Sequence, residues 1–119
     1  MGNRAVLVSH DTNFNNRNEK IGIYLHWFGS EESVKDFLAT AKEKKIKNVD
    51  YSPSYFWARF TQIIANYISE GGSDELSIGV DVVSHLDCAN YDNGVYYIDG
   101  NFNIVKHTDG TELEEYDNE

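Results

Sequence analysis

The sequence predicts an α+β fold in which one antiparallel β-sheet carries two helices on one face. Segments of alternating or β-branched apolar residues lie near both ends of the chain, and two segments with helical periodicity lie between them. The expected order is β-β-α-α-β-β-β, and this segregation of strands from helices is typical of α+β folds. We expect a single domain over residues 1–110 and an acidic, flexible tail over residues 111–119.

Two strands are expected before residue 29. Residues 4–9 contain a short apolar run of the kind found in buried strands. Residues 21–28 alternate, which predicts a strand with two distinct faces. The faces consist of Ile21, Ile23, Leu25 and Trp27, and of Gly22, Tyr24, His26 and Phe28. The asparagine-rich loop between the two strands is too short for a helical crossover, so we expect antiparallel pairing.

Two helices are expected in the middle of the chain. Ser30 is the predicted N-cap of the first helix, with Glu31 and Glu32 in its first turn, where the helix dipole favours acids. The second helix begins at Ser52-Pro53, with Ser52 as N-cap and Pro53 at the first helical position. Its apolar face is broad, so we expect it to be buried on much of its circumference.

Three strands complete the predicted sheet. The alternation over residues 76–83 predicts a third strand with Leu76, Ile78, Val80 and Val82 on its core face. Residues 95–98 form the fourth strand. Asp99-Gly100 is a signal for a two-residue hairpin, which places the fifth strand over residues 102–106.

The charge of the chain points to a basic partner. The 119 residues carry 20 acids against 10 bases, for a net charge of −10. Such a surface argues against direct binding of nucleic acid or of anionic membranes and favours a protein with a basic surface, although acidity can also serve solubility alone. We expect neither a signal peptide nor a membrane span. The single cysteine fits a reducing cytoplasm.

Candidate partner-binding residues are acidic or aromatic. The strand face that carries Tyr24 and Phe28 would show an exposed aromatic contact surface, unless the tail or a long loop covers it. Acidic side chains near the predicted helix termini could dock on a basic surface. The candidate residues are Tyr24, Phe28, Glu31, Glu32, Asp74 and Glu75.

A polar segment over residues 84–94 gathers groups that could bind a metal. It holds the only cysteine of the chain, together with a histidine and two aspartates. We consider a structural zinc site, for which the candidate ligands are His26, Asp81, His85, Asp87, Cys88 and Asp92. The paired spacing of typical zinc sites is absent, and the glutamate and spacing of a calcium-binding EF-hand are absent too. The alternative is a polar hairpin loop in which Cys88 is half-buried.

Catalysis by Cys88 has little support in the sequence. A thiolate pair with His85 or His26 is chemically conceivable, but no flanking signature accompanies it. His10 and His107 lie at strand ends, where solvated or hydrogen-bonding roles are more common than ligation.

Most of the chain up to about residue 106 resembles a family of small proteins carried by phages, prophages and plasmids of Gram-positive bacteria. The stretches that carry the resemblance are Gly2-Asn3-Arg4-Ala5-Val6, Ile23-Tyr24-Leu25-His26-Trp27, Val34 with Phe37-Leu38, Trp57-Ala58-Arg59, Ser77-Ile78-Gly79-Val80-Asp81, Leu86-Asp87-Cys88, Asn90 and Asp92-Asn93-Gly94. Members carry Asn-Gly-Gly-Arg-Asp after the His-Trp pair. Phe28-Gly29-Ser30-Glu31-Glu32 stands there in this chain, so a role for a basic residue is in doubt.

The resemblance implies a counter-defence protein of a mobile element. Some small acidic phage proteins of this kind inhibit type II CRISPR nucleases, whose guide–target heteroduplex lies in a positively charged channel. We therefore expect a non-enzymatic inhibitor that acts in the cytoplasm of the bacterial host, binds the nuclease and hinders target DNA loading. The alternatives are a metal-dependent enzyme acting on a small molecule, such as a signal nucleotide, and a phage accessory or structural protein.

Overall fold

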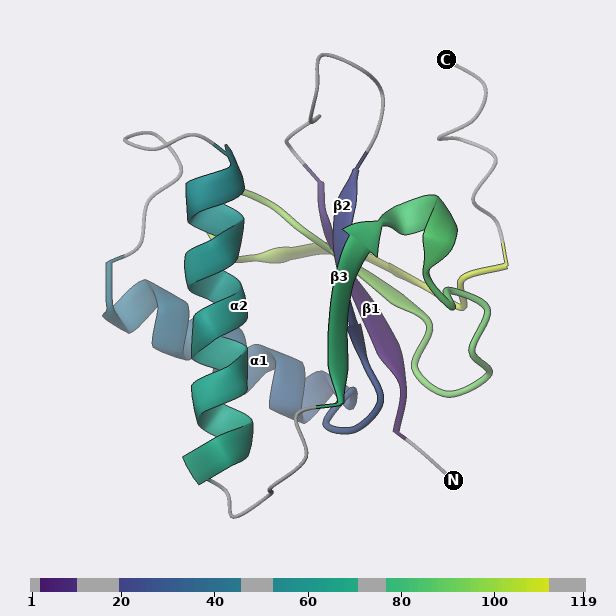
Figure 1. Cartoon of the computed structure of the whole chain (residues 1–119), viewed down its shortest axis with the longest axis horizontal. Coiled ribbons are helices and arrows are strands. Elements are labelled where there is room, and N and C mark those ends of the chain that lie inside the picture. The colour runs from purple at the N-terminus through teal and green to yellow at the C-terminus, as the bar shows by residue number, and fades with distance from the viewer. Residues whose placement is uncertain (1–2, 11–19, 46–52, 71–76, 112–119) are drawn as a thin grey trace.

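The computed structural model describes residues 3–10, 20–45, 53–70 and 77–111. These residues form one sheet of five strands and two α-helices, as expected for an α+β fold (Figure 1). A short 3-10 helix, η1, lies between the third and fourth strands. The predicted order does not contain this helix. The elements are β1 Ala5–Ser9, β2 Ile21–Leu25, α1 Glu31–Glu43, α2 Pro53–Glu70, β3 Ile78–Val82, η1 Val83–His85, β4 Val95–Ile98 and β5 Ile104–Thr108.

The sheet is mixed, so the prediction of a purely antiparallel sheet is wrong. The strand order is β3-β2-β1-β4-β5, and β1 pairs in parallel with β4 from Val6↔Val95 to Ser9↔Ile98. The other three pairings are antiparallel, including the predicted pairing of β1 with β2. It follows that β3 and β4 run in the same direction. Residues 83–94 must therefore cross a face of the sheet instead of turning back in a hairpin.

The two faces of the sheet are covered by different layers. Ala5, Leu7, Ile23 and Leu25 belong to a cluster that includes the buried faces of both helices. Val6 and Val8 face the other way and pack with Val83, Cys88 and Tyr97. In Figure 1 the helices lie on one side of the sheet, and η1 with the following loop lies on the other. We call residues 83–94 the crossover segment.

The helix boundaries follow the predicted capping. Ser30 caps α1, and its hydroxyl accepts a hydrogen bond from the backbone N–H of Ser33 at 3.3 Å. Pro53 opens α2 as predicted, while Ser52 lies outside the described residues. A proline at the first helical position loses no hydrogen bond, because that N–H has no partner within the helix.

The alternation predicted for residues 21–28 stops where β2 ends. Beyond Leu25 the backbone turns, and Phe28 has a positive φ of 65°. Phe28 is half-buried against the helix-side core, with its ring 6.0 Å from that of Tyr67, and Trp27 is 42% exposed. The expected faces of Trp27 and Phe28 are therefore wrong, since the period of two holds only within a strand.

The hairpin between β4 and β5 also differs from the prediction. A longer turn replaces the two-residue turn, and its Asp99 carboxylate accepts hydrogen bonds from the backbone N–H groups of Asn101 and Asn103, both at 2.9 Å. The turn places Phe102, with a φ of 62°, against Phe56 and Phe60 at ring separations of 4.9 and 5.2 Å. The fifth strand begins at Ile104 because Phe102 enters the core from the turn.

Phe102 should be a major source of stability although it lies in a turn. We expect Phe102→Ala to lower the free energy of unfolding by about 3–5 kcal/mol, the usual cost of emptying a buried phenylalanine site. Urea denaturation followed by circular dichroism measures this. Val105→Ala is the control, because Val105 is 46% exposed on the neighbouring strand. A loss below about 1 kcal/mol for Phe102→Ala would contradict the packing described.

Candidate functional site

The crossover segment is organised around the side chain of Asn90, which is 1% exposed. Its Nδ2 lies 2.9 Å from the carbonyl oxygen of Asp87, 3.2 Å from that of Cys88 and 3.3 Å from that of Gly94. Its Oδ1 accepts hydrogen bonds from the N–H groups of Asp92, at 3.1 Å, and Gly94, at 3.0 Å. One amide thus satisfies backbone groups along the whole loop, and its own capacity is fully used.

Arg4 ties the crossover segment to the start of β1. Its Nε donates to Oδ2 of Asp92 at 2.8 Å, and its backbone N–H donates to the same oxygen at 3.1 Å. Its guanidinium also lies 3.5 Å from the carboxylate of Asp87. The hydrogen bonds from Arg4 lower the pKa of Asp92, and Asp92 in turn raises the pKa of Arg4. Asn93 adds a backbone hydrogen bond to the carbonyl of Arg4 at 2.9 Å.

Cys88 packs into the core that the crossover segment forms with the sheet. It is 3% exposed, and its Sγ lies 3.7 Å from the carbonyl oxygen of Val83. Burial, and secondarily the nearby Asp87 carboxylate, raise the pKa of this thiol to about 11. A thiol with such a pKa is protonated at neutral pH, whereas nucleophilic attack requires the thiolate.

The six candidate metal ligands lie in several different surroundings in the structure. His85 and Asp81 are paired at 3.2 Å, Asp87 and Asp92 lie beside Arg4, and Cys88 is buried. His26 instead lies 2.9 Å from the Tyr24 hydroxyl. Within residues 3–10, 20–45, 53–70 and 77–111, no group of three or more His, Cys, Asp or Glu side chains could hold a metal. Zinc therefore stays a prediction without support from this geometry.

The candidate partner-binding residues are also dispersed. Glu31 and Glu32 are exposed at the start of α1, and an ion pair with Lys35 at 3.0 Å lowers the pKa of Glu31. Tyr24 is half-buried beside the core under the crossover segment, whereas Phe28 lies on the helix side. The two rings therefore do not form one exposed aromatic surface. Asp74 and Glu75 lie outside the described residues.

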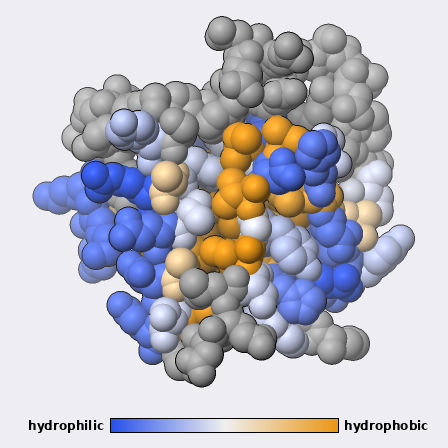
Figure 2. Space-filling model, viewed as in Figure 1, coloured by the Kyte–Doolittle hydropathy of each residue, from blue (hydrophilic) through white to orange (hydrophobic). Residues whose placement is uncertain are grey.

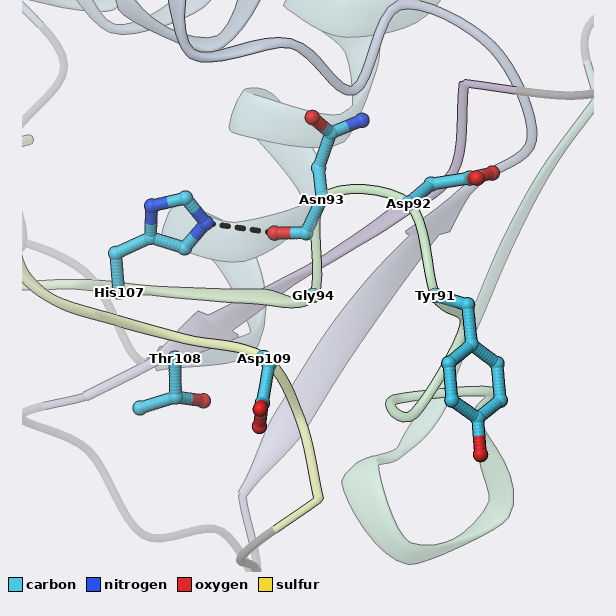
Figure 3. A pocket seen from close by; sticks show the side chains of 7 residues that line it. All are labelled: Tyr91, Asp92, Asn93, Gly94, His107, Thr108 and Asp109. Carbon is cyan, nitrogen blue, oxygen red and sulfur yellow. Dashed lines mark hydrogen bonds between the residues drawn. The ribbon is translucent and has the colours of Figure 1, made fainter.

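A polar pocket of about 300 Å³ lies between the end of the crossover segment and β5. Its lining residues are Tyr91, Asp92, Asn93, Gly94, His107, Thr108 and Asp109 (Figure 3). The His107 ring points to the carbonyl oxygen of Asn93, at 2.6 Å. The side chains of Tyr91 and Asp92 point away from His107. Because the side chains diverge, the pocket has no convergent set of catalytic groups among its lining residues.

Sequence reasoning missed the roles of Arg4 and Asn90. The available signal was the excess of Asn, Asp and Gly in residues 87–94, which is typical of loops with side-chain-to-backbone hydrogen bonds. Nothing in the local pattern identifies Arg4 as the partner of this segment, because the two are 88 residues apart.

We compared the chain with protein-family models, with curated proteins and with solved structures, and none of them matches it. None of the described helices combines the length and the apolar character that crossing a membrane requires.

Removing the Asn90 amide should destabilise the fold. We expect Asn90→Ala to lower the free energy of unfolding by more than about 2 kcal/mol, because several buried backbone groups lose their partners. Asn101→Ala, at an exposed position in the β4–β5 turn, is the control. Chemical denaturation of both variants measures the difference. Equal stability of the two variants would contradict the organising role of Asn90.

The Arg4–Asp92 pair should make stability depend on pH. The pKa of Asp92 is lower in the folded chain than its ordinary value, so the stabilisation is complete above about pH 4 and is lost as the pH falls through the folded pKa. We expect the stability difference between the wild type and Asp92→Asn to shrink below about pH 4. Urea titrations from pH 7 to pH 2 test this, and a difference that stays constant to pH 2 would contradict it.

Proposed function

We propose that the chain is a non-enzymatic, phage-encoded counter-defence protein that inhibits a type II CRISPR RNA-guided nuclease. In this proposal, it binds a basic surface of the nuclease and hinders the loading of target DNA. The resemblance to small proteins of phages and prophages supports the biological setting. The observation that carries the binding mode is the net charge of −10 on a chain of 119 residues.

The negative charge supports both attraction to the nuclease and competition with the nucleic acid that the nuclease binds. An RNA-guided nuclease holds its heteroduplex in a positively charged channel, so an acidic protein can occupy surfaces that otherwise bind phosphates. Long-range attraction also speeds encounter, and this steering weakens with added salt. Exposed carboxylates are available on α1, where the side chain of Glu31 is 57% exposed and Glu32 and Asp36 are also exposed.

The polar groups of the crossover segment have structural roles. Arg4, Asp92 and Asn90 are engaged in holding this segment on the sheet, and burial keeps the Cys88 thiol neutral at pH 7. These groups therefore contribute to the fold of the described residues. A metal-dependent enzyme and a phage accessory protein stay the alternatives.

Co-elution with a type II CRISPR nuclease tests the proposal. We expect a stable complex on size exclusion, with the apo or the guide-loaded nuclease, and loss of target DNA binding by the nuclease in that complex. The double substitution Glu31→Lys/Glu32→Lys should weaken binding at least about tenfold, and the loss should be smaller at high salt.

The control for charge reversal makes the same change in net charge elsewhere. Glu43→Lys/Glu70→Lys alters two exposed residues at the C-terminal ends of the helices and should retain more of the affinity. Thermal unfolding of each variant checks the fold. Binding that survives reversal of every acidic cluster would refute electrostatic docking, and absence of a complex with several nucleases would refute the proposed function.

A further inference from the structure

The sheet has two edges, and they differ in their protection. β5 carries Lys106 and His107, and its pairing with β4 contains a register shift between Tyr97 and Ile98. Lysine and irregular pairing are common devices that prevent an edge strand from pairing with another chain. At the other edge, β3 has Gly79 and Val80 at its centre, and Val80 is 53% exposed. Among the described strands, β3 pairs only with β2.

The register identifies the backbone groups that face outward from β3. Val83 donates to the carbonyl of Lys20, and His26 donates to the carbonyl of Ser77, both at 2.9 Å. Antiparallel pairing alternates, so Gly79 and Asp81 turn their N–H and C=O groups toward β2. Ile78, Val80 and Val82 turn theirs outward. Asp81 accepts the Val82 N–H at 2.7 Å, so the edge is most open at residues 78–80.

The two faces of this edge have different chemistry. Ile78, Val80 and Val82 pair with Leu25, Ile23 and Ile21, and so lie on the helix side of the sheet. Figure 2 shows an apolar band over β3 at the centre of the view. Asp81 lies on the opposite side, with its carboxylate 50% exposed and His85 3.2 Å away. Among the described residues, Gly79 has open space on this side: no atom outside its chain neighbours lies within 4 Å of the position that a Cβ would take there.

We propose that β3 is a docking edge for an extended segment of a basic protein, in which apolar residues alternate with Lys or Arg. The segment adds a sixth strand to the sheet through the outward groups of Ile78 and Val80. An apolar side chain contacts Val80 on the helix side, and a basic side chain pairs with Asp81 on the other. This pattern follows because successive side chains of a strand point to opposite faces.

Charge favours this occupant over a second copy of the chain. In a dimer paired through β3, each copy would bring a net charge of −10 and its own Asp81 carboxylate to the interface. A basic segment instead gains an ion pair across the new strand pair. The inference deepens the proposed function, because it assigns one contact with the basic partner to β3, in addition to the carboxylates of α1.

A synthetic peptide of alternating valine and lysine, capped at both ends, is the probe. We expect its titration to shift the backbone amide signals of residues 78–82 in heteronuclear NMR spectra. Val80→Lys should weaken binding at least about tenfold, and Asp81→Asn about two- to fivefold, as expected for one exposed pair. Val105→Lys, which changes an exposed valine of β5, is the matched control and should bind normally.

Two further peptides keep the test independent of any change in the protein. Methylation of alternate peptide nitrogens removes the donors that pair with β3 and should abolish binding, and replacement of lysine by glutamate should do the same. Equal binding of either analogue, or shifts away from residues 78–82, would overturn the inference. A concentration-dependent dimer in light scattering, with shifts on β3, would also overturn it by assigning the edge to a second copy.

The nuclease experiment separates this inference from the proposed function. If Val80→Lys abolishes peptide binding but leaves nuclease binding intact, docking of the nuclease on β3 is refuted and the proposed function stands. If the peptide binds β3 but no nuclease binds the wild-type chain, the edge is a docking site and the proposed function is refuted.

Discussion

The structure depends on burial of β1 on both faces. Every residue of Ala5–Ser9 is exposed by 2% or less, so the central strand needs an apolar cover on each side. The helices supply one cover, and the crossover segment supplies the other although much of it is polar. A polar loop can fill this role only when its buried backbone groups have partners. The Asn90 side chain provides five such contacts, and Arg4 fixes the end of the loop to β1.

This constraint separates structural residues from those available to a partner. Arg4, Cys88 and Asn90 make contacts within the fold: Arg4 pairs with Asp92, Cys88 packs beside Val83, and the Asn90 amide accepts from Gly94. The exposed carboxylates of α1 and the β3 edge lie outside this arrangement. Attraction at long range and strand pairing at short range complement each other, because charge speeds encounter while backbone hydrogen bonds and side-chain pockets select a sequence.

Local patterns predicted the elements, and the errors arose where distant segments meet. Ser30, Pro53 and the alternation in residues 21–25 identified elements that the structure confirms, since capping and periodicity are local properties. The parallel pairing of β1 with β4 depends on the path of residues 83–94, which no local signal determines. The apolar alternation of β3 predicted a core face, but Val80 is exposed on this edge strand. The prediction failed because alternation does not distinguish an edge strand from a central one. Apart from His26, the metal candidates were grouped by their proximity in sequence, whereas Arg4, 88 residues from Asp92, determines the surroundings of Asp87 and Asp92.

Hydrogen exchange of the backbone amides tests most directly whether the crossover segment is a structural layer. Gly94 N–H is buried and bonded to Asn90, and Asn93 N–H is bonded to the carbonyl of Arg4. We expect both to exchange as slowly as the amides of β1, through global unfolding, and the outward amide of Val80 to exchange much faster. Fast exchange of Gly94 and Asn93 beside protected β1 amides would mean that the loop opens independently, and would contradict the role assigned to Asn90.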